Sequence, residues 1–140
     1  MRFLRINKKE DLYLLKNFVN SLNSEKQSFK YYDNRKFSVV SNHEFTYLLI
    51  NDQNEAIGYG HIDKEENDYW LGIVISEKHQ QKGHGVLMMN KLIQECIIYE
   101  IHRITLSVRK NNEKAINLYN RFGFSIFRED KINLFLEKYL

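Results

Sequence analysis

The chain is 140 residues long, the size of one ordinary domain, and its 43% hydrophobic residues are enough to fill one core. Nine Tyr, nine Phe and one Trp exclude a disordered chain. The net charge of +3 comes from 21 basic and 18 acidic residues without any Lys/Arg block, so the composition does not favour a nucleic-acid-binding protein. The same mild basic excess suits a pocket for a small polyanion equally well.

The single cysteine, Cys96, lies in an apolar helical stretch and is expected to be a buried structural thiol. One cysteine cannot form an internal disulfide, and no Cys/His cluster has the spacing of a metal site, so we expect no metal. The N-terminal residues lack the apolar region of a signal peptide, and no apolar run reaches membrane-spanning length. These features predict a cytoplasmic protein with no membrane partner.

The first part of the chain predicts a strand followed by helices. Charged and apolar residues alternate over 2–6, which indicates a strand. Asn7 and Glu10 form a capping pattern, and apolar residues at helical spacing follow, so a helix is predicted over 8–21. A shorter helix with an aromatic cluster is predicted over 24–36.

The remainder of the chain predicts a sheet with two further helices. Three strands separated by polar turns form an antiparallel meander over 44–51, 56–63 and 68–75. The later elements are a helix over 83–99, a strand over 103–108, a helix over 112–122, and a closing hairpin of strands over 124–129 and 132–138. This order predicts an α+β fold in a single domain over 1–140.

The loop that follows the predicted strand 68–75 is the most informative segment. Gly83 and Gly85 lead into a helix and let the backbone approach a ligand without a β-carbon in the way. The first N–H groups of a helix are unpaired and its dipole favours negative charge, so this loop suits a pyrophosphate, with Lys82 and His84 at its rim. The alternative is that the glycines serve the turn alone, because short glycine motifs also occur by chance.

Two stretches of the sequence resemble the GNAT superfamily of acetyltransferases. The stretch 80–85, Gln-Gln-Lys-Gly-His-Gly, is similar to the family's Gln/Arg-x-x-Gly-x-Gly/Ala loop, which holds the CoA pyrophosphate. The stretch 112–124 looks like the family's Asn-x-x-Ala-x-x-Leu-Tyr-x-x-x-Gly-Phe block. The resemblance implies a mixed, mostly antiparallel twisted sheet of about seven strands flanked by about four helices. It also implies acetyl-CoA as co-substrate.

The resemblance assigns several residues to CoA. The backbone of Ile73, Val74 and Ile75 would face the acetyl group and the pantetheine arm. Asn112 would hydrogen-bond CoA where the fourth and fifth strands separate. The residues expected to surround the pyrophosphate are Gln81, Lys82, Gly83, His84, Gly85 and Val86.

Tyr119, in the Leu-Tyr pair of the second motif, is the candidate general acid. Attack on a thioester expels a thiolate, and a nearby proton donor eases that step. A phenol with a pKa near about 10 is protonated at neutral pH, so it is available as a donor. The alternative is a helical tyrosine that only packs on the sheet, and the motif position favours the catalytic role.

The general base is less well defined. A lysine-like amine with a pKa of about 10.4 is almost wholly charged at neutral pH and must lose a proton before it attacks. Members of the family that acetylate protein N-termini often carry a Glu at one position of the fifth strand. Here the position is Ser107, and a serine cannot act as the base. His61 titrates near neutral pH and shares one face of its predicted strand with Tyr59 and Asp63, so His61 is the candidate base. Asp63 is the second candidate, and an exposed strand histidine without a role is the alternative for His61.

The acceptor is predicted from the aromatic segment 29–35. Tyr32 suits stacking on a sugar or nucleotide, and Arg35 suits contact with a phosphate. The alternative is that the aromatic side chains belong to the core and that Arg35 is solvated. The sequence therefore predicts an N-acetyltransferase acting on a small-molecule primary amine, with a nucleotide-linked amino sugar as one candidate, by direct attack on the thioester. An enzyme acting on a protein N-terminus or lysine and a non-catalytic acyl-CoA-binding module stay open, as does a homodimer.

Overall fold

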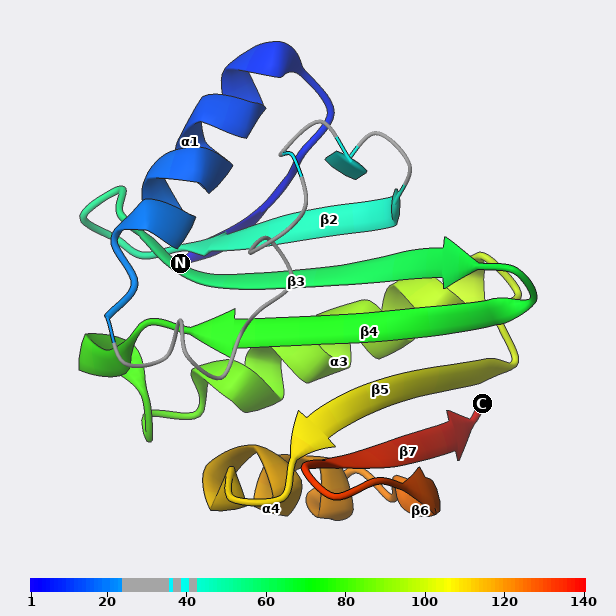
Figure 1. The fold of residues 1–140 in the computed structure, drawn as a ribbon. Helices are drawn as coiled ribbons and strands as arrows, with labels where there is room; N and C mark the ends of the chain where they lie inside the picture. The colour runs from blue at the N-terminus through cyan, green and yellow to red at the C-terminus, as the bar shows by residue number, and fades with distance from the viewer. Residues whose placement is uncertain (24–35, 37–38, 41–42) are drawn as a thin grey trace.

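The computed structural model describes residues 1–23, 36, 39–40 and 43–140. They form a seven-stranded sheet in the order β1-β2-β3-β4-β5-β7-β6 (Figure 1). The strands are β1 (Arg2–Arg5), β2 (His43–Ile50), β3 (Ala56–Glu65), β4 (Asp68–Ile75), β5 (Arg103–Arg109), β6 (Ser125–Glu129) and β7 (Asn133–Tyr139). The helices are α1 (Lys9–Asn20), the short 3-10 helix η2 (Glu77–His79), α3 (His84–Ile98) and α4 (Glu113–Arg121).

The predicted fold class is confirmed. All seven strands and three of the four predicted helices lie within two residues of their predicted bounds. The predicted helix over 24–36 falls outside the described residues except for Lys36. Every pair of neighbouring strands is antiparallel except β4 and β5, which run parallel.

Both faces of the sheet are covered by helices. Alternate residues of the central strands point to opposite faces, so one strand can contribute to the core on each side. On β2, Tyr47 and Leu49 pack in the cluster that contains α3, whereas Leu48 and Ile50 pack in the cluster that contains α1. Both clusters exclude water from β2 and β3. The α1 side contains Leu15, Phe18 and Val19, and the α3 side contains Met88, Met89, Leu92 and Cys96.

The start of α1 differs from its predicted cap. The residue that precedes the helix is Lys8, and the carboxylate of Asp11 accepts from the backbone N–H groups of Asn7 and Lys8, both at 3.1 Å. The predicted pairing of Asn7 with Glu10 is therefore wrong. A carboxylate at the third helical position reaches back to the N–H groups before the helix, and Asp11 holds that position.

Cys96 is buried, as predicted, on the sheet-facing side of α3. Burial, with a smaller effect from Glu95, raises the pKa of its thiol to about 12. The thiol is therefore protonated at neutral pH and packs as a small apolar side chain.

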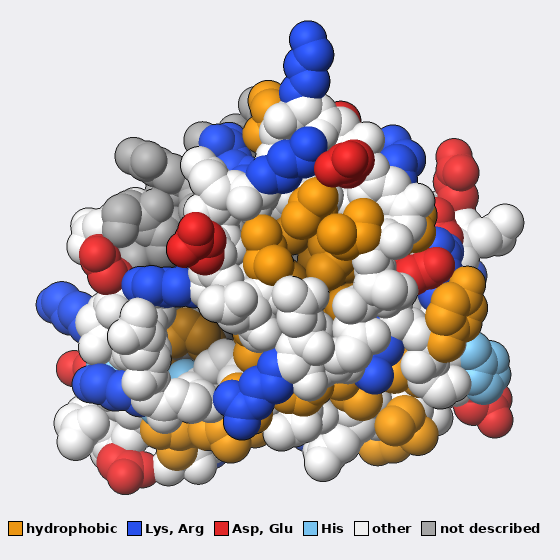
Figure 2. All heavy atoms as spheres, turned by 90° about the horizontal axis from the view of Figure 1, so that it is seen from below, with side chains coloured by type: hydrophobic (Ala, Val, Ile, Leu, Met, Phe, Trp, Pro, Cys, Tyr) orange, Lys and Arg blue, Asp and Glu red, His pale blue; other side chains and the backbone are white. Residues whose placement is uncertain are grey.

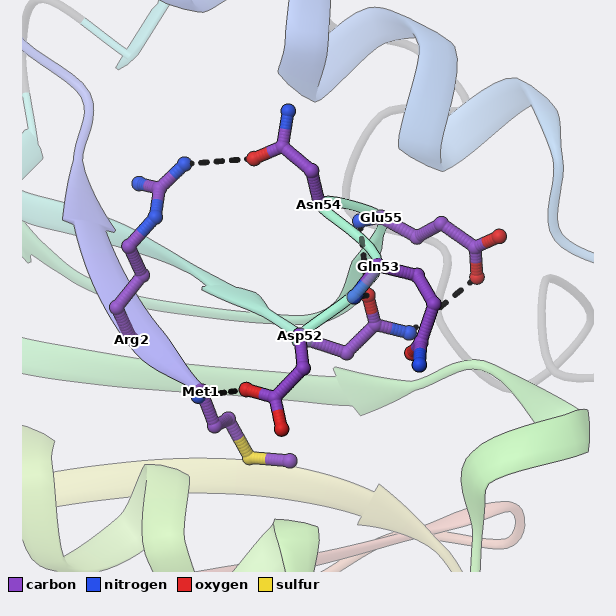
Figure 3. Close-up of polar contacts among 7 residues, drawn as sticks. Met1, Arg2, Asp52, Gln53, Asn54 and Glu55 are labelled. Carbon is purple, nitrogen blue, oxygen red and sulfur yellow. Dashed lines mark hydrogen bonds and ion pairs between the residues drawn. The ribbon is translucent and has the colours of Figure 1, made fainter.

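The first strand is attached to the turn between β2 and β3 by polar contacts (Figure 3). The N-terminal ammonium of Met1 pairs with Asp52, and Arg2 Nη2 donates to Asn54 Oδ1 at 2.9 Å. Within that turn the Asn51 side chain accepts from the backbone N–H of Gln53 and that of Glu55. These contacts hold β1 at the edge of the sheet.

The surface carries charges of both signs. The face seen in Figure 2 shows Lys/Arg and Asp/Glu side chains interspersed between apolar patches, in agreement with the absence of a basic block in the sequence. Among the helices of the described chain, none combines the length and the apolarity that crossing a bilayer requires.

Candidate functional site

A cleft of about 1220 Å³ lies where β4 and β5 separate. The two strands are paired at Trp70 and Thr105, and in the described chain they share no further pair toward their C-terminal ends. Figure 1 shows the two arrowheads diverging. The edge of β4 from Leu71 to Ile75 therefore lines the cleft with backbone that β5 does not pair. This is the separation of strands that the resemblance implied.

One end of the cleft is formed by the loop between β4 and α3. Gly83 precedes the helix with φ 85°, a left-handed conformation that favours glycine. The first backbone bond of the helix runs from Leu87 N to Gly83 O at 3.1 Å, so the N–H groups of the preceding residues have no partner within the helix. The loop thus presents N–H donors and the positive end of a helix dipole, the groups that bind a phosphate.

Gly85 allows two close approaches. It lines the cleft, as expected for a ligand-facing glycine. A β-carbon at Gly85 would also lie 3.3 Å from Leu118 Cδ2, so the glycine brings the start of α3 close to α4. The sequence indicated the approach of a ligand to Gly85 and did not indicate the packing of α3 against α4.

The loop is tied to the elements on both sides of the cleft by Gln80. Its Nε2 donates to the backbone carbonyl of Ile75 at 2.9 Å, and its Oε1 accepts from Lys114 Nζ at 3.4 Å. Gln80 therefore links the end of β4 to α4 and holds the loop at the mouth of the cleft.

Some of the residues predicted to surround the pyrophosphate line the cleft, and others do not. Four of them line the cleft, namely Gln81, Gly83, Gly85 and Val86. Lys82 is exposed, and His84 uses its Nδ1 in a hydrogen bond with the carbonyl of His79 at 2.8 Å. Neither Lys82 nor His84 is among the residues that line the cleft. Their contact with a phosphate stays a prediction.

Asn112 lies at the cleft and begins α4. Its side-chain oxygen accepts from the backbone N–H of Ala115 at 3.3 Å and so caps the helix. The side-chain oxygen of Asn112 thus has a structural role that the sequence analysis did not assign. The predicted contact with CoA is left to the amide nitrogen.

Tyr119, on α4, lines the cleft with a side chain that is 6% exposed. Its ring packs edge-on against Phe124 at 5.7 Å between centroids. Burial raises the pKa of the phenol to about 12, so the hydroxyl carries its proton throughout the neutral range. Tyr119 is thus a core residue that keeps its hydroxyl proton beside the cleft, and its role as general acid stays a prediction.

His61 lines the cleft from β3 and is only 2% exposed, so the exposed alternative is wrong. Its Nδ1 lies 2.6 Å from Tyr59 Oη, and Asp63 is buried two residues further along the same face. The contact of Tyr59 with His61, and the place of His61 and Asp63 in one cleft, agree with the predicted shared face of these three residues. The role of His61 as the general base stays a prediction.

The cleft is charged differently at its two ends. Asp63 and Glu65 line it near the turn between β3 and β4, beside the indole of Trp70. The other described lining residues with charged side chains are Arg109, Lys114 and Arg121, which are basic, and Glu77 in the loop after β4. Because β3 runs two residues further than predicted, Glu65 joins the face of His61, which the sequence analysis missed.

Two predicted acceptor residues, Tyr32 and Arg35, lie outside the described residues. Within the part of the chain that is described, no three His, Cys, Asp or Glu side chains gather as a metal site would require.

The family model of the acetyltransferase (GNAT) family matches residues 10–124. The chain belongs to this family. The predicted family is thereby confirmed, and it is a family of acetyltransferases that use acetyl-CoA, the enzyme class and co-substrate that the sequence predicted. The single domain over 1–140, the cytoplasmic location and the homodimer stay predictions.

Among curated proteins, this GNAT chain is similar to the spermine/spermidine N(1)-acetyltransferase of Bacillus subtilis (strain 168). The two are 41% identical over 73 residues, which cover 51% of this chain and 48% of the relative. The chain thus spans about half the length of the curated relatives it matches.

Solved structures share the fold at low sequence identity. The GNAT domain of PAT from S. lividans superposes with a TM-score of 0.81 at 18% identity, covering 99% of this chain and 90% of the other. Spermidine N-acetyltransferase from Vibrio cholerae, solved with CoA and spermine, gives a TM-score of 0.75 at 19% identity, with 98% and 95% coverage.

Proposed function

We propose that this GNAT chain transfers an acetyl group from acetyl-CoA to a primary amine of a small, multiply charged aliphatic amine of the polyamine class. The observation that carries the proposal is the acidic end of the cleft. His61 and Asp63 lie side by side there, and Glu65 and Trp70 line the entrance. The curated relatives are named for spermine and spermidine, which supports the same class.

The acidic end suits a second ammonium group on the acceptor. Carboxylates pair with ammonium groups, and the face of an indole attracts a cation within about 6 Å. An amine that reaches His61 with one end would place its next charged nitrogen near Asp63, Glu65 or Trp70. A neutral or phosphorylated acceptor would gain nothing from these carboxylates.

The proposed chemistry uses one proton acceptor and one proton donor of the chain. Acetyl-CoA supplies the activated acetyl thioester. His61 takes a proton from the ammonium, and the freed amine nitrogen forms a bond to the acetyl carbon while the carbon–sulfur bond breaks. Tyr119 gives its proton to the departing thiolate and is reprotonated by the second proton that the nitrogen loses as the amide forms, while His61 releases its proton to solvent. The net products are the acetamide, free CoA and one proton.

A polyamine replaces the nucleotide-linked amino sugar that the sequence analysis put forward. That choice rested on Tyr32 and Arg35, which lie outside the described residues, and none of the relatives reported above is named for a sugar substrate. Two alternatives stay open, namely a protein amine as acceptor and a non-catalytic acyl-CoA-binding module. The amine screen that tests the polyamine class also tests both of them.

An amine screen that follows free CoA release tests the proposal. We expect turnover of aliphatic diamines and polyamines, with kcat/KM at least about tenfold above monoamines, which corresponds to about 1.4 kcal/mol of extra binding. Glu65→Gln should raise the KM for diamines and leave monoamines unaffected, whereas Glu66→Gln, in the adjoining turn outside the cleft, is the matched control. Turnover of peptides or amino-sugar nucleotides alone would overturn the polyamine class, and binding without turnover would identify a non-catalytic module.

A variant at Gly85 tests the acetyl-CoA site. Gly85→Val adds a branched side chain beside the N–H groups at the start of α3 and against Leu118. We expect the Kd for acetyl-CoA to rise tenfold or more, a loss of about 1.4 kcal/mol per decade. Calorimetric titration measures the effect, and Leu87→Ala, exposed on the same helix and outside the cleft, is the control. Equal binding by the Gly85 variant would place the pyrophosphate elsewhere.

A further inference from the structure

A second imidazole lies against the proposed base. His43 begins β2, the strand that lies beside β3 in Figure 1, and its Cα pairs with that of Asp63 on β3. The rings of His43 and His61 are stacked, with centroids 4.5 Å apart and an interplanar angle of 14°. Nothing in the sequence indicated this contact, because it depends on the register of two strands.

The stacked pair is held by residues of three adjacent strands. Thr46 Oγ1 lies 2.7 Å from His43 Nδ1, and Tyr59 Oη lies 2.6 Å from His61 Nδ1. On β4, the residue that pairs with His61 is Gly72, and a β-carbon there would lie only 2.5 Å from His61 Cε1. The imidazole of His61 thus fits between the ring of His43 and the bare backbone of Gly72.

The two histidines face different spaces. His61, almost fully buried, lines the cleft described above. His43 is partly exposed and lines a separate hollow of about 290 Å³ with Thr46, Glu44 and Arg5. The pair therefore lies between the cleft and a second pocket lined by residues of β1 and β2.

Two imidazolium ions at this separation repel each other strongly, so the pair takes up one proton well before it takes up two. Burial disfavours the charged form, and His61 is the more buried ring, which favours His43 as the site of the first proton. Asp63 is buried two residues from His61 on β3, and its Cα pairs with that of His43, so its carboxylate favours one positive charge on the pair. Among the described residues, the other titratable or charged groups toward the pair are Tyr59 on β3, Glu44 on β2 and Arg5 on β1, while β4 presents Trp70 and Gly72 and α1 presents apolar side chains.

We propose that His43 is a positioning residue that holds the ring of His61 and keeps it free of a proton below neutral pH by taking the first proton of the pair. This inference rests on the proposed transferase function with His61 as its base. It explains how a buried imidazole stays available as a proton acceptor in a cleft lined by carboxylates, which would otherwise favour its charged form.

The first test is the pH profile of kcat/KM in His43→Phe, which keeps a stacked ring and removes the titrating group. Without a positive neighbour, His61 binds a proton more readily. The acid limb should therefore move upward by roughly one pH unit, while the plateau at high pH changes little. His43→Asn keeps a side-chain partner for Thr46, and it should move the limb in the same direction and lower the plateau through kcat, because stacking is lost. His102→Phe, an exposed histidine outside both pockets, is the matched control.

The second test reads protonation without turnover. The imidazole Cε1–H resonance of His61, followed by NMR from about pH 5 to 9, should titrate at higher pH in both His43 variants than in the wild type. Unchanged titration of His61 in both variants overturns the inference, even if the enzyme is active. Absence of acetyl transfer by the wild type contradicts the proposed function instead, and the NMR titration then still decides whether the pair is coupled.

Discussion

Replacing Tyr119 by phenylalanine is expected to lower kcat by about 10²- to 10⁴-fold, the usual contribution of a general acid. The variant removes only the hydroxyl that is proposed to protonate the departing thiolate, so the Kd for acetyl-CoA should stay within about twofold of the wild-type value. Single-turnover kinetics under conditions where chemistry limits the rate measure the effect. Tyr13→Phe, which removes a hydroxyl from an exposed position on α1, is the control.

The pKa of Tyr119 makes this prediction sharper. Because burial raises the pKa to about 12, the protonated phenol persists well above the pH at which an ordinary tyrosine ionises. The wild-type rate should therefore show no fall assignable to Tyr119 between about pH 8 and pH 10. A Phe variant that retains most of its kcat would leave Tyr119 as a packing residue beside Phe124.

The framework of the fold could be predicted because it follows from periodicity and turns. Buried alternation on β2 to β4 and the apolar face of α3 are properties of short stretches, which the sequence contains completely. The loop at Gly83 was predictable for the same reason, since a glycine at positive φ before a helix is a local feature. The cap of α1 was mispredicted because two carboxylates, Glu10 and Asp11, are adjacent in the sequence and only the geometry selects one.

The details of the candidate site depend on contacts between strands, which a single sequence does not contain. The meeting of His43 with His61 requires the register of β2 on β3, and that register shifts between His43 and Phe45. The fit of Gly72 under His61 has the same origin, because it joins β3 to β4. Exposure is a further example: strand alternation placed His61 and Asp63 on one face, and only the structure shows that this face is buried beside a cleft.

Replacing His61 by glutamine is expected to lower kcat/KM by about 10²-fold or more near neutral pH, because the acceptor ammonium then loses its proton acceptor. In the variant the attacking amine must reach its free form unaided. Since that fraction rises tenfold with each pH unit below the amine pKa of about 10.4, the variant should recover steadily as the pH rises. The ratio of wild-type to variant activity should accordingly be larger near about pH 6.5 than near about pH 9, and the acid limb of the wild-type profile should disappear.

The control for His61→Gln is His102→Gln, the same substitution at an exposed position outside the cleft. Thermal unfolding of both variants separates loss of the base from any loss of stability caused by removing the hydrogen bond between His61 and Tyr59. Acetyl-CoA affinity should be unchanged, because His61 pairs with Gly72 in the middle of β4, whereas the loop at Gly83 follows the end of that strand. If the acid limb persists in His61→Gln and disappears in Asp63→Asn, the proton acceptor is Asp63. His61 then serves to orient that carboxylate within the same buried face.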